Sequence, residues 1–211
     1  MNEELVNDDV QMNSLVTSHE SPATNSKGGI PLDAVKCLIS RRSIREYMDT
    51  PLKKSQVENV ISMAQMASSW ENGQPVRYVA VMDKEIKHRL AMECTGGFPW
   101  NQEYIDDAPA LIVLCVVKGI SGYEPDGSPS TEKGSHWQSF DAGVAAAHFC
   151  LAARAMKLGT LIMGRYDEKK VKQILSLPEE YDVACLIAMG YPAVIPAAAE
   201  RKTIDEILTF K

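Results

Sequence analysis

The 211-residue sequence contains no stretch that is long and apolar enough to span a membrane. Its N-terminus also lacks the basic region followed by an apolar core that marks a signal peptide. Long basic runs are missing too: the formal net charge is -6, and residues 1–30 hold five acids against one base. A near-neutral body without a basic stripe argues against nucleic-acid binding. These absences predict a cytoplasmic protein that acts on neither membranes nor nucleic acids.

Cysteine is sparse and has no pattern. The five cysteines are scattered along the chain, and no two of them form a CxxC pair. An odd, scattered set in mainly apolar segments predicts reduced thiols that pack as small hydrophobic groups. The sequence therefore predicts neither a disulfide framework nor a metal site.

The remaining composition is that of an ordinary globular protein, with 45% hydrophobic and 24% charged residues. Residues 1–29 are polar, without sustained apolar periodicity, and end in Lys27-Gly28-Gly29. They are predicted to form a flexible leader, or an arm that a partner subunit orders. A single compact domain is expected over residues 30–211.

Periodicity within that domain predicts helices alternating with strands, and hence an α/β or α+β fold around one sheet. Residues 118–135 are rich in Gly, Ser, Pro and acids, and are expected to be a mobile surface loop that covers a site. The helix at 140–158 is apolar almost all round, which predicts burial in a core or an interface, with Gly159 as its cap. Helices are expected from Pro31 to the residue before Arg41 and over 54–67, 84–94, 140–158, 167–175 and 203–208, and strands over 78–82, 110–117, 160–163 and 183–189.

Two polar segments carry the functional signal. Arg41-Arg42-Ser43-Ile44-Arg45 ends the first helix, and Ser69 to Pro75 follows the second. Taken alone, the arginine pair would be a solvated helix end, favoured by the helix dipole. Three guanidinium groups cannot enter a core without anionic partners, however. Together with the Ser/Asn/Gln loop they predict a pocket for a phosphate and a polar heterocycle, as in flavin mononucleotide (FMN).

Five motifs in a fixed order resemble the nitroreductase family of FMN-dependent NAD(P)H oxidoreductases, from about Leu32 to Leu208. The resemblance implies an α+β fold, with a central, mainly antiparallel sheet surrounded by helices, in an intertwined homodimer with FMN at the subunit interface. The motifs are the arginine cluster after its helix, residues 67–75, Asp107-Ala108-Pro109, the helix from Asp141 to Leu158-Gly159-Thr160, and Gly190-Tyr191-Pro192 followed by Arg201-Lys202.

The resemblance also implies roles for residues at the cofactor. Arg41 and Ser43, with Arg201 and Lys202, would hold the phosphate and ribityl chain, and Arg45 would place a cation near the flavin ring. The loop from Ser69 would reach the ring from the second subunit, and the Gly164 N–H would face flavin N5. The complete implied cofactor set is Arg41, Arg42, Ser43, Arg45, Ser69, Trp70, Asn72, Gln74, Asn101, Met163, Gly164, Arg201 and Lys202.

The implied reaction is ping-pong: NADH or NADPH reduces the flavin, and a small oxidised acceptor such as a nitroaromatic, a quinone or a flavin takes the electrons. No side chain is needed as nucleophile or general base. The alternatives are a flavin-binding storage or sensor protein without turnover, and an oxidative or dehalogenating member of the superfamily. Phe98, Trp100 and Arg165 are the candidate substrate residues. Trp100 fits interface packing equally well, and Arg165 fits pairing with a surface acid.

Overall fold

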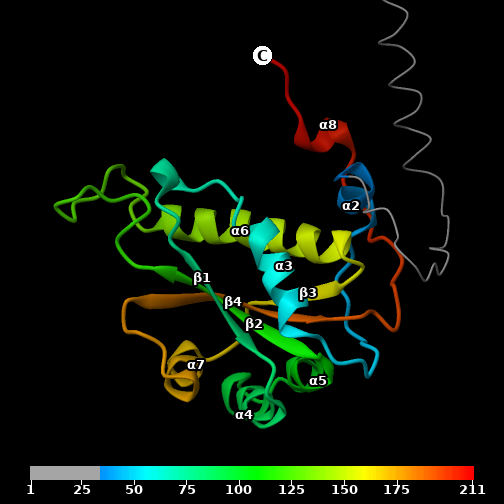
Figure 1. Ribbon diagram of the computed structural model, residues 1–211. Coiled ribbons are helices and arrows are strands. Elements are labelled where there is room, and N and C mark those ends of the chain that lie inside the picture. Colours follow the sequence, from blue (N-terminus) through cyan, green and yellow to red (C-terminus); the bar gives the residue numbers. More distant parts are fainter. Residues whose placement is uncertain (1–33) are drawn as a thin grey trace, which may run out of the picture.

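The computed structural model describes residues 34–211, so the predicted leader and the helix start at Pro31 lie outside the described residues. Helices cover both faces of a four-stranded antiparallel sheet of order β1-β2-β4-β3 (Figure 1). This confirms the predicted α+β fold with an antiparallel sheet. The elements are α2 (Ala34–Ser40), α3 (Lys54–Ala64), the short 3-10 helix η1 (Trp70–Asn72), β1 (Val76–Val81), α4 (Lys84–Cys94), α5 (Pro99–Asp107), β2 (Ala110–Val117), α6 (His136–Ala155), β3 (Gly159–Met163), α7 (Glu168–Leu175), β4 (Tyr181–Gly190) and α8 (Ile204–Ile207).

Strand β2 lies in the middle of the fold and separates two cores. Its alternate side chains point to opposite faces, as the period of a strand requires. Ile112 and Leu114 pack with α3 and α6 on one face, whereas Leu111 and Val113 pack with α4, α5 and α7 on the other. The uninterrupted apolar run at 110–117 is therefore that of a strand buried on both faces.

The chain departs from the expected elements at α5, at α6 and at the predicted cap, and also at α3, which ends at Ala64 and not at residue 67. Helix α5 was not expected, because its nine residues contain only one aliphatic side chain, Ile105, and so show no apolar period. Helix α6 begins at His136 and ends at Ala155, earlier at both ends than predicted. The expected cap at Gly159 is wrong, since the left-handed residue after α6 is Lys157, with φ 63°, and Gly159 begins β3.

The segment from 118 to 135 only partly matches the exposed loop that was expected. Its outer part, around Asp126, is exposed, but Ser121 is fully buried. The Ser121 hydroxyl donates a 2.6 Å hydrogen bond to Asp141 Oδ2 on α6, and so ties the loop to the helix. The base of this segment is therefore part of the scaffold.

All five cysteines are buried; apolar surroundings predicted this for four of them but not for Cys94. Burial raises the pKa of Cys94 and Cys115 to about 11 and that of Cys185 to about 12. These thiols therefore behave as hydrophobic side chains at neutral pH. Within residues 34–211, no helix combines the length and the apolar character that crossing a membrane requires.

Candidate functional site

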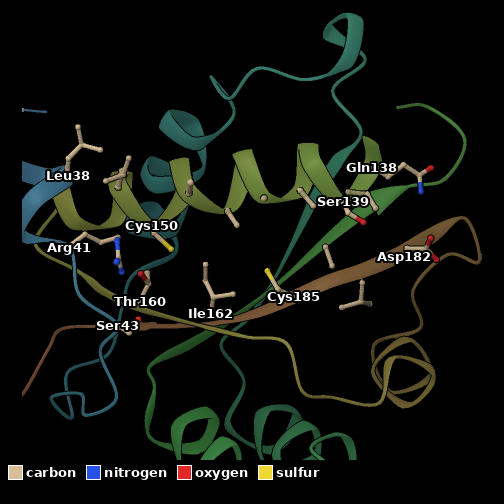
Figure 2. A pocket seen from close by; sticks show the side chains of 18 residues that line it. Leu38, Arg41, Ser43, Gln138, Ser139, Cys150, Thr160, Ile162, Asp182 and Cys185 are labelled. Carbon is tan, nitrogen blue, oxygen red and sulfur yellow. The ribbon is translucent and has the colours of Figure 1, made fainter. Parts of the chain in front are cut away.

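A cavity of about 790 Å³ lies between α6 and the β3–β4 side of the sheet (Figure 2). Thr160 and Ile162 of β3 and Cys185 of β4 line it from the sheet. Helix α6 contributes small side chains such as Ala142 and Ala146, which leave the space open. The volume is in the range of small-molecule and cofactor sites.

Arg41 and Ser43 line this cavity because the chain after α2 runs beside β3. Ser43 forms a bridge with Thr160, and the Ile44 N–H donates to the Thr160 carbonyl at 3.0 Å. The approach needs a glycine: a Cβ at Gly159 would lie 2.5 Å from Ile44 Cγ1. Gly159 thus serves to place the arginine segment against the sheet.

Arg41 belongs to a cluster of three guanidinium groups. Arg42 donates to the Ile39 and Arg41 carbonyls at 2.7 and 2.9 Å, and Arg154 Nε donates to Ser40 Oγ at 3.0 Å. Burial, and then the nearby Arg42 charge, lower the pKa of Arg154. Within residues 34–211 no carboxylate lies within ion-pair distance of any of the three. The cluster therefore has the charge to hold an anion.

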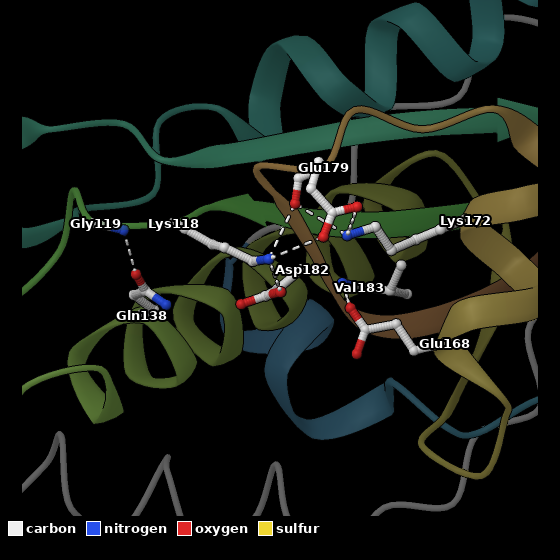
Figure 3. A network of polar contacts seen from close by, with 8 residues as sticks. All are labelled: Lys118, Gly119, Gln138, Glu168, Lys172, Glu179, Asp182 and Val183. Atoms are coloured by element: carbon white, nitrogen blue, oxygen red, sulfur yellow. Dashed lines mark hydrogen bonds and ion pairs between the residues drawn. The ribbon is translucent and has the colours of Figure 1, made fainter.

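The opposite end of the cavity carries an acid that is already paired. Asp182 lines the cavity, and its Oδ1 lies 3.3 Å from Lys118 Nζ (Figure 3). Lys118 also donates to the Glu179 carbonyl at 3.0 Å, and Gln138 Oε1 accepts from the Gly119 N–H at 2.7 Å. The free positive charge of the cavity is thus confined to the arginine end.

Besides Arg42, which lines only a smaller pocket beside the cavity, three of the predicted cationic residues do not line the cavity. Arg45 is exposed, and its Nη1 lies 3.4 Å from the Ser43 carbonyl. Arg201 and Lys202 are exposed in the segment between β4 and α8. Within one chain, the structure brings Arg41 and Ser43 together and leaves these three apart.

Arg154 was missed by reasoning from the sequence. It lies 113 positions after Arg41, and both residues line a second, smaller pocket beside the first. One feature of the sequence could have indicated its role: Arg154 is the one basic residue in the last turn of a mainly apolar helix.

The loop from Ser69 to Gln74 is held in an unusual conformation. The backbone φ angles of Glu71, Asn72 and Gln74 are 46°, 57° and 46°. Residues other than glycine seldom adopt this region. Asp141 Oδ2 accepts from the Trp70 N–H at 2.9 Å, and the Gln74 N–H donates to Ser69 Oγ at 3.0 Å. The loop therefore presents exposed side chains at Asn72 and Gln74, and neither of them lines the cavity of its own chain.

A second group of predicted residues gathers where β3 ends and α5 begins. The Arg165 guanidinium lies 4.5 Å from the centre of the Phe98 ring, and Phe98 meets Trp100 edge to face at 5.0 Å. Buried Asn101 donates from Nδ2 to the Arg165 carbonyl at 3.1 Å. Met163 is buried just before, and Gly164 is exposed between it and Arg165.

Comparison with known proteins identifies the family of the chain. The family model described as the Nitroreductase family matches residues 38–99 and 98–191. The FMN reductase [NAD(P)H] of Bacillus subtilis is 30% identical over 174 residues, which are 76% of this chain and 66% of that protein. The NADPH-flavin oxidoreductase of Vibrio harveyi is 28% identical over 172 residues, covering 80% of this chain and 70% of that protein.

Solved structures share the fold. A protein from Exiguobacterium sibiricum, assigned as a nitroreductase and crystallised with FMN, superposes with a TM-score of 0.74 at 20% identity. The match covers 88% of this chain and 100% of the other.

Proposed function

This chain belongs to the nitroreductase family of flavin oxidoreductases, and from that membership we propose that it binds FMN and passes electrons from NADH or NADPH to a small oxidised acceptor. The arginine end of the cavity carries the proposal. Three guanidinium groups without a carboxylate partner among residues 34–211 adjoin a cavity of about 790 Å³. Such a cluster is stable when an anion such as a phosphate neutralises it.

The residues present fit FMN. Arg41 and Ser43 would bind its phosphate through charge-assisted hydrogen bonds, and Arg154 would add positive potential from behind Ser40. No GxGxxG motif that would cradle the pyrophosphate of a dinucleotide occurs in the sequence, which favours FMN over FAD. When bound, the flavin would supply hydride acceptance and electron transfer, while the chain supplies binding and orientation. To bind FMN, Arg45, Arg201 and Lys202 would have to move toward the cavity when a second subunit or FMN itself binds.

Three surfaces support the further proposal of a homodimer. Val35, Leu38 and Ile39 of α2 are 45, 62 and 40% exposed, so the rest of residues 34–211 does not cover the apolar face of that helix. Helix α6 leaves Phe140 60% exposed beside a run of small residues. No residue of the 69–74 loop lines the cavity of its own chain, as expected of a loop that serves a partner's flavin.

An anaerobic stopped-flow experiment tests the proposal. The FMN-reconstituted protein is mixed with NADH or NADPH, and the flavin absorbance is followed. Rapid bleaching, followed by reoxidation with a nitroaromatic or quinone that shows ping-pong kinetics, is the expected result. A bound flavin that neither nucleotide bleaches would instead favour a storage or sensor protein. Reoxidation confined to halogenated substrates would favour a dehalogenating enzyme.

A further inference from the structure

The cluster beside Gly164 combines a cation with two aromatic rings. The Arg165 guanidinium stacks on one face of Phe98, at 4.5 Å. Trp100 meets the same ring edge to face and is itself 56% exposed. The buried amide of Asn101 holds the Arg165 backbone at 3.1 Å. Backbone and side chain of Arg165 are thus both positioned, although the residue is exposed.

Within the described part of the chain, the charge of Arg165 is not paired with an acidic side chain. Among residues 34–211, no carboxylate lies within ion-pair distance of it. Stacking occupies one face of the guanidinium, but its N–H donors lie in the plane of the group and stay available. A planar guanidinium offers paired donors whose spacing matches a carboxylate.

We propose that Phe98, Trp100 and Arg165 form a binding surface that selects planar aromatic acceptors carrying a carboxylate or a similar anionic group. Arg165 takes the anion and the exposed face of Trp100 takes the ring, while Phe98 holds both in place. This inference rests on the proposed function, because Gly164, the residue before Arg165, is the one expected to lie at the reactive part of the flavin.

The test compares 4-nitrobenzoate with its neutral counterpart 4-nitrobenzamide. Reduction of either nitro group to nitroso consumes one NAD(P)H and one proton and releases water. The kcat/KM ratio of benzoate to benzamide is measured for the wild-type holoprotein and for Arg165→Gln, Arg165→Lys and the control Arg89→Gln. Comparing this ratio between the variants and the wild type cancels the difference in ring reactivity of the two compounds. Arg89 is an exposed arginine of α4 that pairs with Glu93 at 3.2 Å.

Arg165→Gln is expected to lower the ratio roughly three- to tenfold, the scale of one partly exposed charge-assisted contact. Arg165→Lys should restore part of it, because a lysine keeps the charge but not the planar fork. Arg89→Gln should match the wild type. Trp100→Ala should lower kcat/KM for both compounds. An unchanged ratio in Arg165→Gln, with benzamide reduction intact, would overturn the proposal.

A binding measurement separates this proposal from the reductase assignment. The affinity of the oxidised holoprotein for 4-nitrobenzoate is measured by calorimetry, without any turnover. Weaker binding in Arg165→Gln than in wild type supports the surface even if neither compound is reduced, in which case the reductase assignment fails. Equal affinities in the two proteins reject the surface, whatever the kinetics show.

Discussion

At the scale of single residues, the site depends on side chains whose partners lie far away in the sequence. Arg41 reaches the cavity because Gly159 lets Ile44 approach β3, and Arg154 joins it through Ser40. Asp141 is only 2% exposed and connects two loops, with its Oδ2 accepting from Trp70 and Ser121. Each of these contacts places a polar group in a position that its immediate neighbours would not determine.

Arg41→Ala is expected to weaken FMN binding by about 1.5–3 kcal/mol, the scale of a hydrogen bond to a charged group. The reason is the loss of the guanidinium that lines the cavity. FMN dissociation constants from equilibrium titration of the apoprotein measure the effect. Arg89→Ala removes an arginine from the distant surface of α4 and should leave FMN affinity unchanged. An Arg41→Ala protein with wild-type affinity would remove the phosphate role of this residue.

Asp141→Ala is expected to lower the free energy of unfolding by about 2–3 kcal/mol, because it leaves the Trp70 N–H and the Ser121 hydroxyl without an acceptor in a buried place. Urea unfolding curves of the two proteins give the difference. Glu132→Gln changes an exposed acid in the same loop and serves as the control. If both variants unfold at the wild-type midpoint, Asp141 does not hold the two loops.

At the scale of elements, α6 has two different faces. One packs on the sheet through residues such as Ala145 and Phe149, and the other exposes, at intervals of four, Ser139, Gly143 and Ala147, which also line the cavity. A Cβ at Gly143 would meet nothing within 4 Å in the single chain. The small side chains at these three positions allow the close approach of a second helix, which agrees with the proposed dimer.

Gly143→Leu is expected to convert the dimer to a monomer, because a leucine at the proposed contact would hold the two helices apart. Mass from light scattering during size-exclusion chromatography measures this. As the control, Lys169→Leu places a leucine on α7, on the opposite face of the sheet. It should leave the mass of the dimer unchanged. A Gly143→Leu protein that remains dimeric would place the interface elsewhere.

At the scale of the whole molecule, the sheet divides the chain into two cores and distributes buried thiols between them. Cys94 and Cys115 belong to one core and Cys185 to the other. A thiol in an unfolded chain ionises near pH 8.5, whereas burial raises the pKa of these three to between about 11 and about 12. Above pH 8.5 the unfolded state therefore loses protons that the folded state keeps, so stability falls as pH rises.

Raising the pH from 8 to 9.5 is therefore expected to cost about 1 kcal/mol per buried thiol, or roughly 3 kcal/mol for the three together. Lys87 acts in the opposite direction, because burial lowers its pKa, but it is a single group. Urea midpoints at the two pH values, with a reductant present, measure the loss. In Cys115→Ala, the loss of stability between pH 8 and pH 9.5 should be smaller by about 1 kcal/mol, the contribution of one thiol. Equal midpoints at pH 8 and 9.5 would contradict this account.

Local patterns were sufficient for much of the fold. The helix at 84–94 and the strand at 110–117 have the predicted bounds, because apolar period and flanking turns are properties of neighbouring residues. Helix α5 was not predicted, because the helix-start signal, Pro99 in its first turn, is not followed by an apolar period.

The sequence by itself determined most of the elements and the arginine-rich character of the site, since these depend on residue types and short spacings. Periodicity left the fold as α/β or α+β, and only the family resemblance implied an antiparallel sheet. Only the tertiary structure decided which arginines share the cavity: Arg41 and Ser43 line it, Arg154 stands behind, and Arg45 faces solvent. It also decided that Arg165 stacks on Phe98. The physical reason is that side-chain direction depends on contacts between distant segments, such as Phe98 with Arg165, 67 positions apart, and Ser43 with Thr160, 117 positions apart, which no local pattern encodes.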